Sequence, residues 1–230
     1  MSELVGKLSV VATPIGNMGD ITLRAIETLR SAEVIFCEDT RVAGKLLERL
    51  EIPKKELVRA DAEKETGAAA LAAAHLEIGK HIVYVSDAGT PGISDPGARL
   101  VAYVREQVPE AVIEAVPGAS SVIGALSIAG INDDRFTFLG FVPHKKGRET
   151  FFNSLSVYEH PVVFFESPHR ILKTIEALKS IESNDNLNVT VVRELTKLHE
   201  EVIQGTPEEV LAILNENPVK QKGEFVVIVN

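Results

Sequence analysis

Runs of apolar and β-branched residues alternate with segments of helical periodicity along the first half of the chain. The expected strands are 8–12, 34–37, 81–85 and 112–116, and the expected helices are 20–30, 41–50, 95–105 and 119–129. A further helix is expected at 62–78, an alanine-rich segment with Leu71 and Leu76 as its apolar anchors. This alternation is typical of an α/β fold with a largely parallel sheet.

The pattern changes after residue 135. The expected strands are then 136–142, 161–165, 189–193, 200–204 and 224–229, and the expected helices are 149–157, 170–179 and 207–214. The strands on either side of the turn at 195–199 predict a hairpin, so this half is expected to contain a mixed or antiparallel sheet. We therefore expect two α/β domains, residues 1–116 and 117–230, with a ligand cleft between them.

The composition and charge of the chain exclude several classes of protein and site. The 230 residues are 45% hydrophobic, enough for a sizeable core, and their formal net charge is −9, so a nucleic-acid partner must meet a local basic patch. The single cysteine, Cys37, excludes an intramolecular disulfide and a Cys-rich zinc site, and we expect no metal. No apolar stretch approaches the roughly 18 residues that span a bilayer, so we expect a cytoplasmic protein without membrane contact.

Three loops rich in glycine, proline and small polar residues follow expected strands of the first half. They are 12–20, 87–97 and 117–121. Because the carboxyl ends of parallel strands share one edge of the sheet, these loops are expected to converge on a ligand. Each of them could instead be only a turn that leads into a helix.

The loops lack the usual phosphate-binding fingerprints. Residues 16–19 read Gly-Asn-Met-Gly and do not form G-x-G-x-x-G, and no G-x-x-x-x-G-K-[ST] occurs, which disfavours NAD and ATP. Carbonyls, a carboxylate and small residues suit the adenine, ribose hydroxyls and amino-acid end of S-adenosylmethionine. The sequence therefore predicts S-adenosylmethionine as a candidate cofactor.

Seven motifs in sequence carry a family resemblance. They are residues 13–22, 37–41, 86–97, 116–121, 140–143, 165–170 and 193–197. Together, in order and between about residues 8 and 229, they resemble the ribosomal RNA small subunit methyltransferase I family of the tetrapyrrole methylase superfamily. The resemblance implies a homodimer of two-domain α/β subunits that hold S-adenosylmethionine between the domains. The implied reaction methylates the ribose 2′-hydroxyl of a cytidine near the decoding site of small-subunit ribosomal RNA.

The same resemblance implies the cofactor-binding residues. They are Pro14, Asp87, Ala88, Gly89, Thr90, Ile93, Ser94, Pro117, Gly118, Ala119, Ser120 and Phe141. Members of this family often continue past the last strand with a small helical tail, whereas this sequence stops at Asn230. We therefore expect any grip on RNA that such a tail provides to be absent.

Methyl transfer to a ribose hydroxyl needs a base or a cation near the oxygen, because the hydroxyl is a weak acid. The candidates are Asp39, Glu166, His169, Glu194 and Lys197. We favour Glu194 and Lys197, whose motif matches the family, together with Asp39. Alternatively, Asp39 or Thr40 caps a helix, and the charges at 193–199 face solvent at a hairpin tip.

Basic residues provide the candidate contacts to RNA. The only dense basic cluster in this acidic chain is 144–148, in which Lys145 and Lys146 suit a phosphate backbone. Arg41, His169 and Arg170 are further candidates for substrate binding, through phosphate pairing, stacking or proton transfer. Each of these segments could instead be ordinary solvated surface.

Two other functions remain open from the sequence. One is a methyltransferase that acts on a tetrapyrrole or another small molecule, since it would share the cofactor site. The other is a non-catalytic RNA-binding factor for ribosome assembly. A requirement for RNA as the methyl acceptor would distinguish the RNA methyltransferase from the first alternative. Catalytic turnover would distinguish it from the second.

Overall fold

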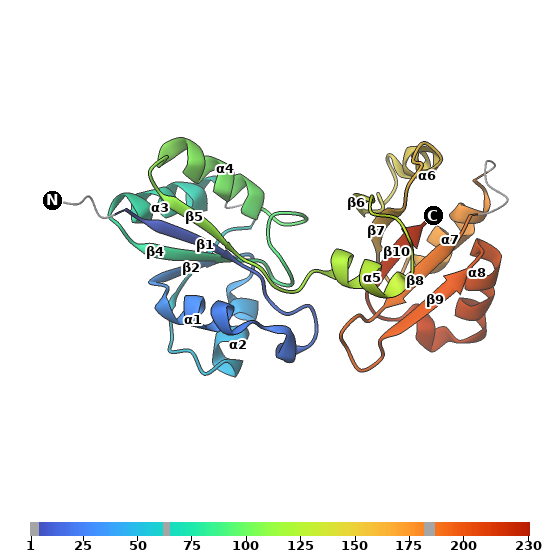
Figure 1. Ribbon diagram of the computed structural model, residues 1–230, viewed down its shortest axis with the longest axis horizontal. Coiled ribbons are helices and arrows are strands. Elements are labelled where there is room, and N and C mark those ends of the chain that lie inside the picture. Colours follow the sequence, from blue (N-terminus) through green and yellow to red (C-terminus); the bar gives the residue numbers. More distant parts are fainter. Residues whose placement is uncertain (1–4, 62–64, 182–186) are drawn as a thin grey trace. The chain divides into compact units, whose positions relative to one another are not determined.

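The computed structural model describes residues 5–61, 65–181 and 187–230 (Figure 1). The chain divides into two compact units, Met1–Ser120 and Ser121–Asn230, whereas the sequence placed the boundary after Val116. Each unit is described by itself, and the cleft expected between them stays a prediction. The start of the helix expected at 62–78 lies outside the described residues.

The first unit contains a parallel sheet. Within its described residues the strand order is β3-β2-β4-β1-β5, and the strands are β1 Lys7–Val11, β2 Val34–Cys37, β3 Glu56–Arg59, β4 His81–Val85 and β5 Val112–Val116. All neighbouring strands pair in parallel, which confirms the predicted sheet type. Strand β3 was not predicted. It lies at the sheet edge and has no buried residue, so its sequence lacks the apolar run that marks the other strands.

Helices cover both faces of this sheet (Figure 1). They are the α-helices α1 Leu23–Ser31, α2 Thr40–Arg49, α3 Glu65–Glu77 and α4 Gly97–Gln107, and the short 3₁₀ helix η1 Met18–Asp20, which has no buried residue, precedes α1. Successive strand residues face opposite sides, so Val83 and Val85 pack with α1 and α2, while Ile82 and Tyr84 pack with α3 and α4. In α3, Leu76 is buried as predicted, but Leu71 is 41% exposed and its expected anchoring role is wrong.

The second unit contains the mixed sheet that the sequence predicted. Its described residues form the strand order β6-β7-β10-β8-β9, with β6 Thr137–Phe141, β7 Val162–Glu166, β8 Val189–Arg193, β9 Glu201–Gly205 and β10 Phe225–Val229. Only β6 and β7 pair in parallel among these neighbours, and the β8–β9 hairpin is confirmed.

Two helical layers sandwich this second sheet. The helices are α5 Ser121–Ala129, α6 Arg148–Leu155, α7 Ile171–Lys179 and α8 Pro207–Glu216, with the 3₁₀ helix η2 Pro218–Gln221. Helices α6, α7 and α8 share one hydrophobic core with the sheet, and α5 packs against the other face. In the part of the chain that the structure describes, no helix combines the length and apolar character needed to cross a membrane.

Candidate functional site

The loops that follow β1, β4 and β5 meet at the carboxyl edge of the first sheet. The amide of Ala12 donates to the carbonyl of Val116 at 3.1 Å, and Thr13 and Gly89 exchange two backbone hydrogen bonds at 3.0 and 3.1 Å. The hydroxyl of Thr90 donates to the carbonyl of Ala119 at 2.9 Å. The predicted convergence of these loops is therefore confirmed, and we call the backbone of residues 12–14, 87–90 and 117–119 the loop rim.

Two glycines allow the rim to close. Gly89 has a φ of +84°, and a Cβ atom added there would lie 3.1 Å from Cγ2 of Ile15 and 3.6 Å from the carbonyl oxygen of Ala119. A Cβ atom on Gly118 would lie 2.9 Å from Cβ of Ala12, closer than real Cβ contacts. The loops of the rim therefore pack closely on one another, and the residues that allow this are small.

Asp95 shapes the loop that continues beyond the rim. Its carboxylate accepts hydrogen bonds from the amides of Gly92 at 2.7 Å and Gly97 at 2.9 Å and from the hydroxyl of Tyr84 at 3.2 Å. The side chain of Ile93 is left 59% exposed in this ordered loop. Such an exposed apolar side chain is available to a ligand.

Two carboxyl groups beside the rim have raised pKa values. Glu38 accepts a hydrogen bond from the amide of Asp87 at 2.8 Å, and Asp87 accepts one from the amide of Asp39 at 3.1 Å. Burial raises the pKa of Glu38 and that of Asp87, and neighbouring acidic groups add to both shifts. The sequence analysis did not include Glu38 among the proton acceptors. Its place directly after β2, at the same sheet edge as Asp87, is the signal that could have indicated it.

Asp39 is the N-cap of α2, as one of the two interpretations predicted. Its carboxylate accepts from the amide of Arg41 at 2.8 Å and from Nε of the Arg41 guanidinium at 3.0 Å. Hydrogen bonds from Arg41 hold the pKa of Asp39 well below its usual range. Asp39 is thus a poor proton acceptor, and the guanidinium expected to meet substrate is already paired with it.

Glu166 organises the carboxyl end of β7. Its side chain is fully buried and accepts hydrogen bonds from the guanidinium of Arg170 at 2.8 Å and from the amide of Ser167 at 2.7 Å. Arg170 also donates to the carbonyl of Val142 at 2.8 Å, which ties the start of the basic loop to this carboxylate. Arg170 therefore has its partners inside the protein, whereas Lys145, Lys146 and His169 are exposed.

Substituting Glu166→Gln is expected to lower the free energy of unfolding by about 2 kcal/mol, because hydrogen bonds to a charged group contribute about 1.5–3 kcal/mol. The amide keeps the shape of the side chain but leaves the guanidinium of Arg170, which is only 15% exposed, without its counter-charge. Urea unfolding monitored by circular dichroism measures this change. The matched control is Glu176→Gln on α7, whose carboxylate is 61% exposed and should move stability by less than about 0.5 kcal/mol. Equal stability of both variants would contradict the buried pairing.

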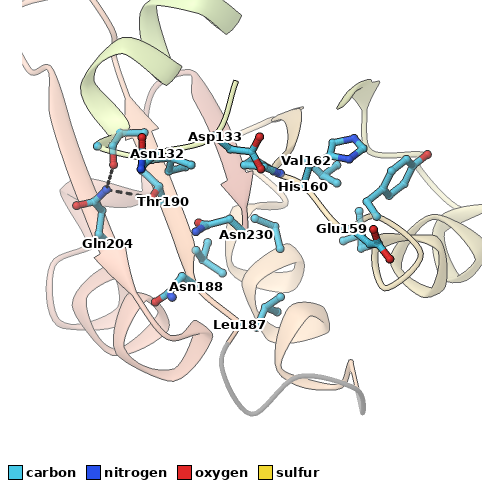
Figure 2. A pocket seen from close by; sticks show the side chains of 18 of the residues that line it. Asn132, Asp133, Glu159, His160, Val162, Leu187, Asn188, Thr190, Gln204 and Asn230 are labelled. Carbon is cyan, nitrogen blue, oxygen red and sulfur yellow. Dashed lines mark hydrogen bonds between the residues drawn. The ribbon is translucent and has the colours of Figure 1, made fainter. Parts of the chain in front are cut away.

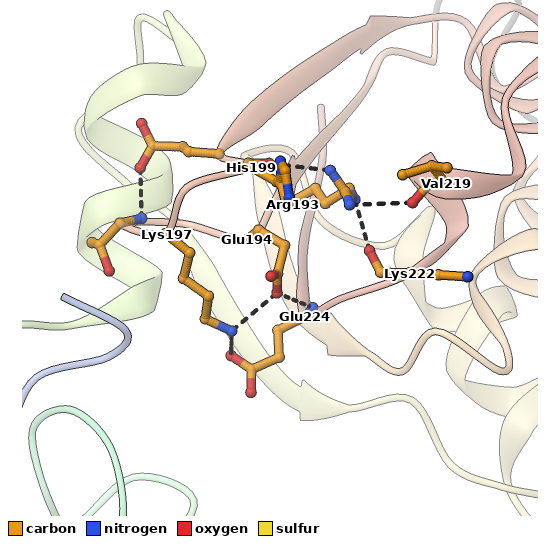
Figure 3. Close-up of polar contacts among 9 residues, drawn as sticks. Arg193, Glu194, Lys197, His199, Val219, Lys222 and Glu224 are labelled. Atoms are coloured by element: carbon orange, nitrogen blue, oxygen red, sulfur yellow. Dashed lines mark hydrogen bonds and ion pairs between the residues drawn. The ribbon is translucent and has the colours of Figure 1, made fainter.

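The segment 193–199 forms a turn (Figure 3). Strand β8 ends at Arg193, because the left-handed φ values of Glu194 (51°) and Thr196 (66°) stop the strand. Residues 193, 195 and 197 therefore do not form a continued strand with their side chains on one face. The buried guanidinium of Arg193 donates to the carbonyls of Lys222 at 2.7 Å, His199 at 3.1 Å and Val219 at 3.1 Å. These bonds fix the geometry of the turn.

Lys197 lies between two carboxylates in this turn (Figure 3). Its Nζ is 3.0 Å from Oε1 of Glu194 and 2.9 Å from Oε2 of Glu224. The pKa of Lys197 is raised. Burial lowers this pKa, but hydrogen bonds to Glu224 and Glu194 raise it by more. Burial likewise opposes the lowered pKa of Glu194, which follows from hydrogen bonds donated by the Glu224 amide and Lys197. At neutral pH Lys197 is therefore a positioned cation that cannot accept a proton.

Phe141, at the end of β6, is a partly free aromatic side chain. It is 58% exposed, and its ring centroid lies 5.2 Å from that of Phe165. An edge contact of this kind holds the ring while one face remains accessible.

A cavity of about 740 Å³ lies at the opposite edge of the second sheet (Figure 2). Its lining mixes apolar and polar residues and includes Asn188 and Thr190 at the start of β8, Gln204 near the end of β9, and Asn132 and His160. Among its described lining residues, none belongs to the predicted site. Nor does any group of three or more His, Cys, Asp or Glu side chains within the described ranges have the arrangement needed for a metal ion.

Comparison with known proteins assigns this chain and its fold to a family. Residues 7–211 match the family model of the tetrapyrrole (corrin/porphyrin) methylases. The crystal structure of uroporphyrin-III C-methyl transferase from Thermus thermophilus, complexed with S-adenyl homocysteine, superposes with a TM-score of 0.63 over 98% of this chain and 97% of that one. At 19% sequence identity, this likeness shows a shared fold. The chain belongs to the tetrapyrrole methylase family.

Curated relatives define the branch of the family. "Ribosomal RNA small subunit methyltransferase I" of Synechocystis sp. is 42% identical over 226 residues, which cover 98% of this chain and 79% of that protein. The protein of the same name from Haemophilus influenzae is 40% identical over 230 residues, or 100% of this chain and 80% of the relative. The resemblance that the sequence motifs indicated is thereby confirmed.

Proposed function

We propose that this protein transfers the methyl group of S-adenosylmethionine to the ribose 2′-hydroxyl of a cytidine in small-subunit ribosomal RNA. The observation that carries the proposal is the loop rim, in which three strand-end loops are joined by hydrogen bonds of 2.9–3.1 Å. The names of relatives about 40% identical over nearly the whole chain support the substrate. The bound S-adenosyl homocysteine of the Thermus thermophilus protein supports the cofactor.

The rim residues would hold the cofactor through backbone groups. In our proposal the amides and carbonyls of 87–90 and 117–119 contact the adenosine and amino-acid parts, with Pro14, Ile93 and Ser94 at their borders. Ser120 and Phe141 stay further candidates that the family resemblance implies. When bound, S-adenosylmethionine supplies a methyl group on a positively charged sulfur. The loops of the rim are hydrogen-bonded to one another, and positioning of the reactants is itself worth several kcal/mol of the barrier.

Lys197 is the residue that we assign to the developing charge. A ribose hydroxyl that accepts the methyl group would lose its proton to solvent, and a cation near the oxygen would stabilise the partial negative charge that develops there. The two carboxylates within 3.0 Å of Nζ keep Lys197 protonated and aligned for this role. Glu194 is therefore a positioning residue, and Asp39 contributes by ordering the start of α2.

Methyl transfer from tritiated S-adenosylmethionine tests the proposed function. Small ribosomal subunits that lack the cytidine modification should accept label, whereas fully modified subunits, the matched control, should not. Digestion to nucleosides should then recover the label in 2′-O-methylcytidine. Binding of S-adenosylmethionine without transfer to RNA, or transfer to a tetrapyrrole such as uroporphyrinogen instead, would contradict the proposal.

The exposed lysines of the loop 143–147 are proposed to contact the RNA backbone. Replacing Lys145 and Lys146 with alanine is expected to reduce the slope of log binding constant against log salt by about 1.4, because each single-strand phosphate contact contributes about 0.7. Filter binding of RNA across salt concentrations measures the slope. The control, Arg24→Ala with Lys54→Ala, removes the same charge from exposed positions of the first unit and should leave the slope unchanged. An unaltered slope in the first variant would show that the loop does not contact RNA.

We also propose that the protein is a cytoplasmic homodimer, as the family resemblance implies. Light scattering during size-exclusion chromatography should give twice the chain mass of 24.9 kDa. A single-chain mass at micromolar concentration would contradict the homodimer.

A further inference from the structure

A small cavity in the first unit borders the loop rim. Its volume is about 230 Å³, and its lining includes Pro14 and Met18 from the loop after β1, Cys37 and Val85 from the ends of β2 and β4, and Val42 from α2. Pockets that hold drug-sized ligands measure about 300–1,000 Å³. This cavity is therefore too small for a whole S-adenosylmethionine, but it suits a single planar ring.

One face of α2 forms a wall of this cavity. Val42, Lys45, Leu46 and Arg49 all line it, and their spacing of three and four residues places them on one side of the helix. Val42 is 39% exposed although it is apolar, as expected at the mouth of a cavity. The wall therefore alternates apolar surface with positive charge.

The two cations on this wall have no partner in the part of the chain that the structure describes. Within the described residues, neither Lys45 nor Arg49 forms a side-chain hydrogen bond or an ion pair, and both are exposed. Nearby basic residues differ, because Arg41 is paired with Asp39, and Lys55 donates to the carbonyls of Arg30 and Ala32. These two cations outnumber the one carboxylate of the described lining, Asp87, so the border of the cavity carries a net positive charge that suits an anion with an attached apolar group.

The cavity also shares residues with the rim. Thr13, Ser86 and Asp87 line it, and the hydroxyl of Thr13 donates to the carbonyl of Ser86 at 3.3 Å. A ring held in the cavity would therefore lie directly beside the loops that we assign to the methyl donor. This position would bring the RNA that receives the methyl group close to the methyl donor.

We propose that this cavity binds one nucleotide of the acceptor RNA, with its base between Met18 and Val42 and its phosphate on Lys45 and Arg49. The proposal rests on the proposed function for the identity of the polymer. Unstacked bases commonly enter apolar pockets in nucleic-acid enzymes, and backbone phosphates pair with lysine and arginine. Lys45 and Arg49 lie outside the seven motifs that carried the family resemblance, so that resemblance assigned them no role.

Methionine methyl NMR tests the subsite without turnover. The chain contains two methionines, so protein with ¹³C-methyl methionine gives two signals, and Met18→Leu identifies the one at the cavity. Cytidine 5′-monophosphate, cytidine and inorganic phosphate are titrated separately, in the absence of S-adenosylmethionine. We expect the nucleotide to shift the Met18 signal at lower concentration than cytidine does, and inorganic phosphate alone to leave it unmoved.

Removing the two cations separates phosphate recognition from base recognition. Lys45→Ala with Arg49→Ala should weaken binding of the nucleotide about tenfold, because charge-assisted contacts to phosphate are lost. Cytidine binding should not change, and the Arg24→Ala, Lys54→Ala control should bind the nucleotide as the unmodified chain does. Circular dichroism melting verifies that each variant is folded.

Three results would overturn the subsite: no shift of Met18 with the nucleotide, equal nucleotide affinity after removal of both cations, or an equal shift with phosphate alone. Failure of the proposed function is distinguishable from these. Nucleotide binding at Met18 without methyl transfer to small subunits would refute the reaction and keep the subsite. Methyl transfer with no response at Met18 would refute the subsite and keep the reaction.

Discussion

Replacing Gly89 with valine is expected to abolish binding of S-adenosylmethionine, with at least about a 100-fold loss of affinity, equivalent to about 2.7 kcal/mol. The residue has a φ of +84°, which a β-branched side chain adopts only at a cost of about 1–3 kcal/mol. Its added atoms would also lie among the rim residues, since Cβ alone approaches Cγ2 of Ile15 to 3.1 Å. Isothermal titration calorimetry measures the affinity.

A matched glycine separates backbone strain from loss of the site. Gly130 has a φ of +67°, and a Cβ atom there would meet nothing within 4 Å, so Gly130→Val carries a similar strain away from the rim. Both variants should melt at somewhat lower temperature, but Gly130→Val should bind S-adenosylmethionine normally. Unchanged affinity of a folded Gly89→Val protein would show that the rim is not the cofactor site.

Replacing Lys197 with methionine is expected to slow methyl transfer by about 100-fold to 1,000-fold, as when one group that stabilises transition-state charge is removed. Methionine keeps much of the length of the side chain but removes the ammonium that lies 2.9 Å from Glu224 and 3.0 Å from Glu194. Single-turnover transfer to saturating small subunits isolates this step. The affinity for S-adenosylmethionine should not change, because we assign cofactor binding chiefly to the rim of the first unit.

Glu224→Gln provides the control for Lys197. The carboxylate of Glu224 is 80% exposed, and Glu194 remains as a partner for the ammonium, so this variant should retain most of the rate. Because the pKa of Lys197 is raised, its cation persists through neutral and mildly alkaline pH, and the rate advantage over Lys197→Met should be constant there. A Lys197→Met enzyme with the normal rate would remove Lys197 from the reaction.

Most strands could be predicted because they are buried on both faces. Strands β2, β4 and β8 begin and end where the apolar runs do, since helices cover both sides of each sheet and every strand residue can be apolar. Strand β5 lies at a sheet edge with only Val116 buried, and its β-branched residues are the signal that predicted it. Strand β3 could not be predicted, because a four-residue edge strand without a buried residue is held by pairing with β2 rather than by its own pattern. The convergence of the loops followed from strand direction, which the strand–helix alternation implied.

The polar contacts of side chains in the site could not be predicted from the spacing of residues in the sequence. Glu224 meets Lys197 across 27 positions of the chain, and the carbonyl of Val142 meets Arg170 across 28, so neither contact has a local signature. Arg170 and Lys145 read alike as free basic residues, yet only the first has a buried carboxylate beside it. The sequence thus indicated which motifs carry charge, and the fold determined which of those charges remain available to a substrate.

The central claim is that the loop rim binds the cofactor, and a crystal structure of the full chain with S-adenosylhomocysteine tests it most directly. This claim predicts that the ligand contacts the backbone of residues 87–90 and 117–119. It also predicts that no side chain of these loops occupies the place of the ligand. A ligand bound in the 740 Å³ cavity of the second unit, with the rim empty, would contradict it.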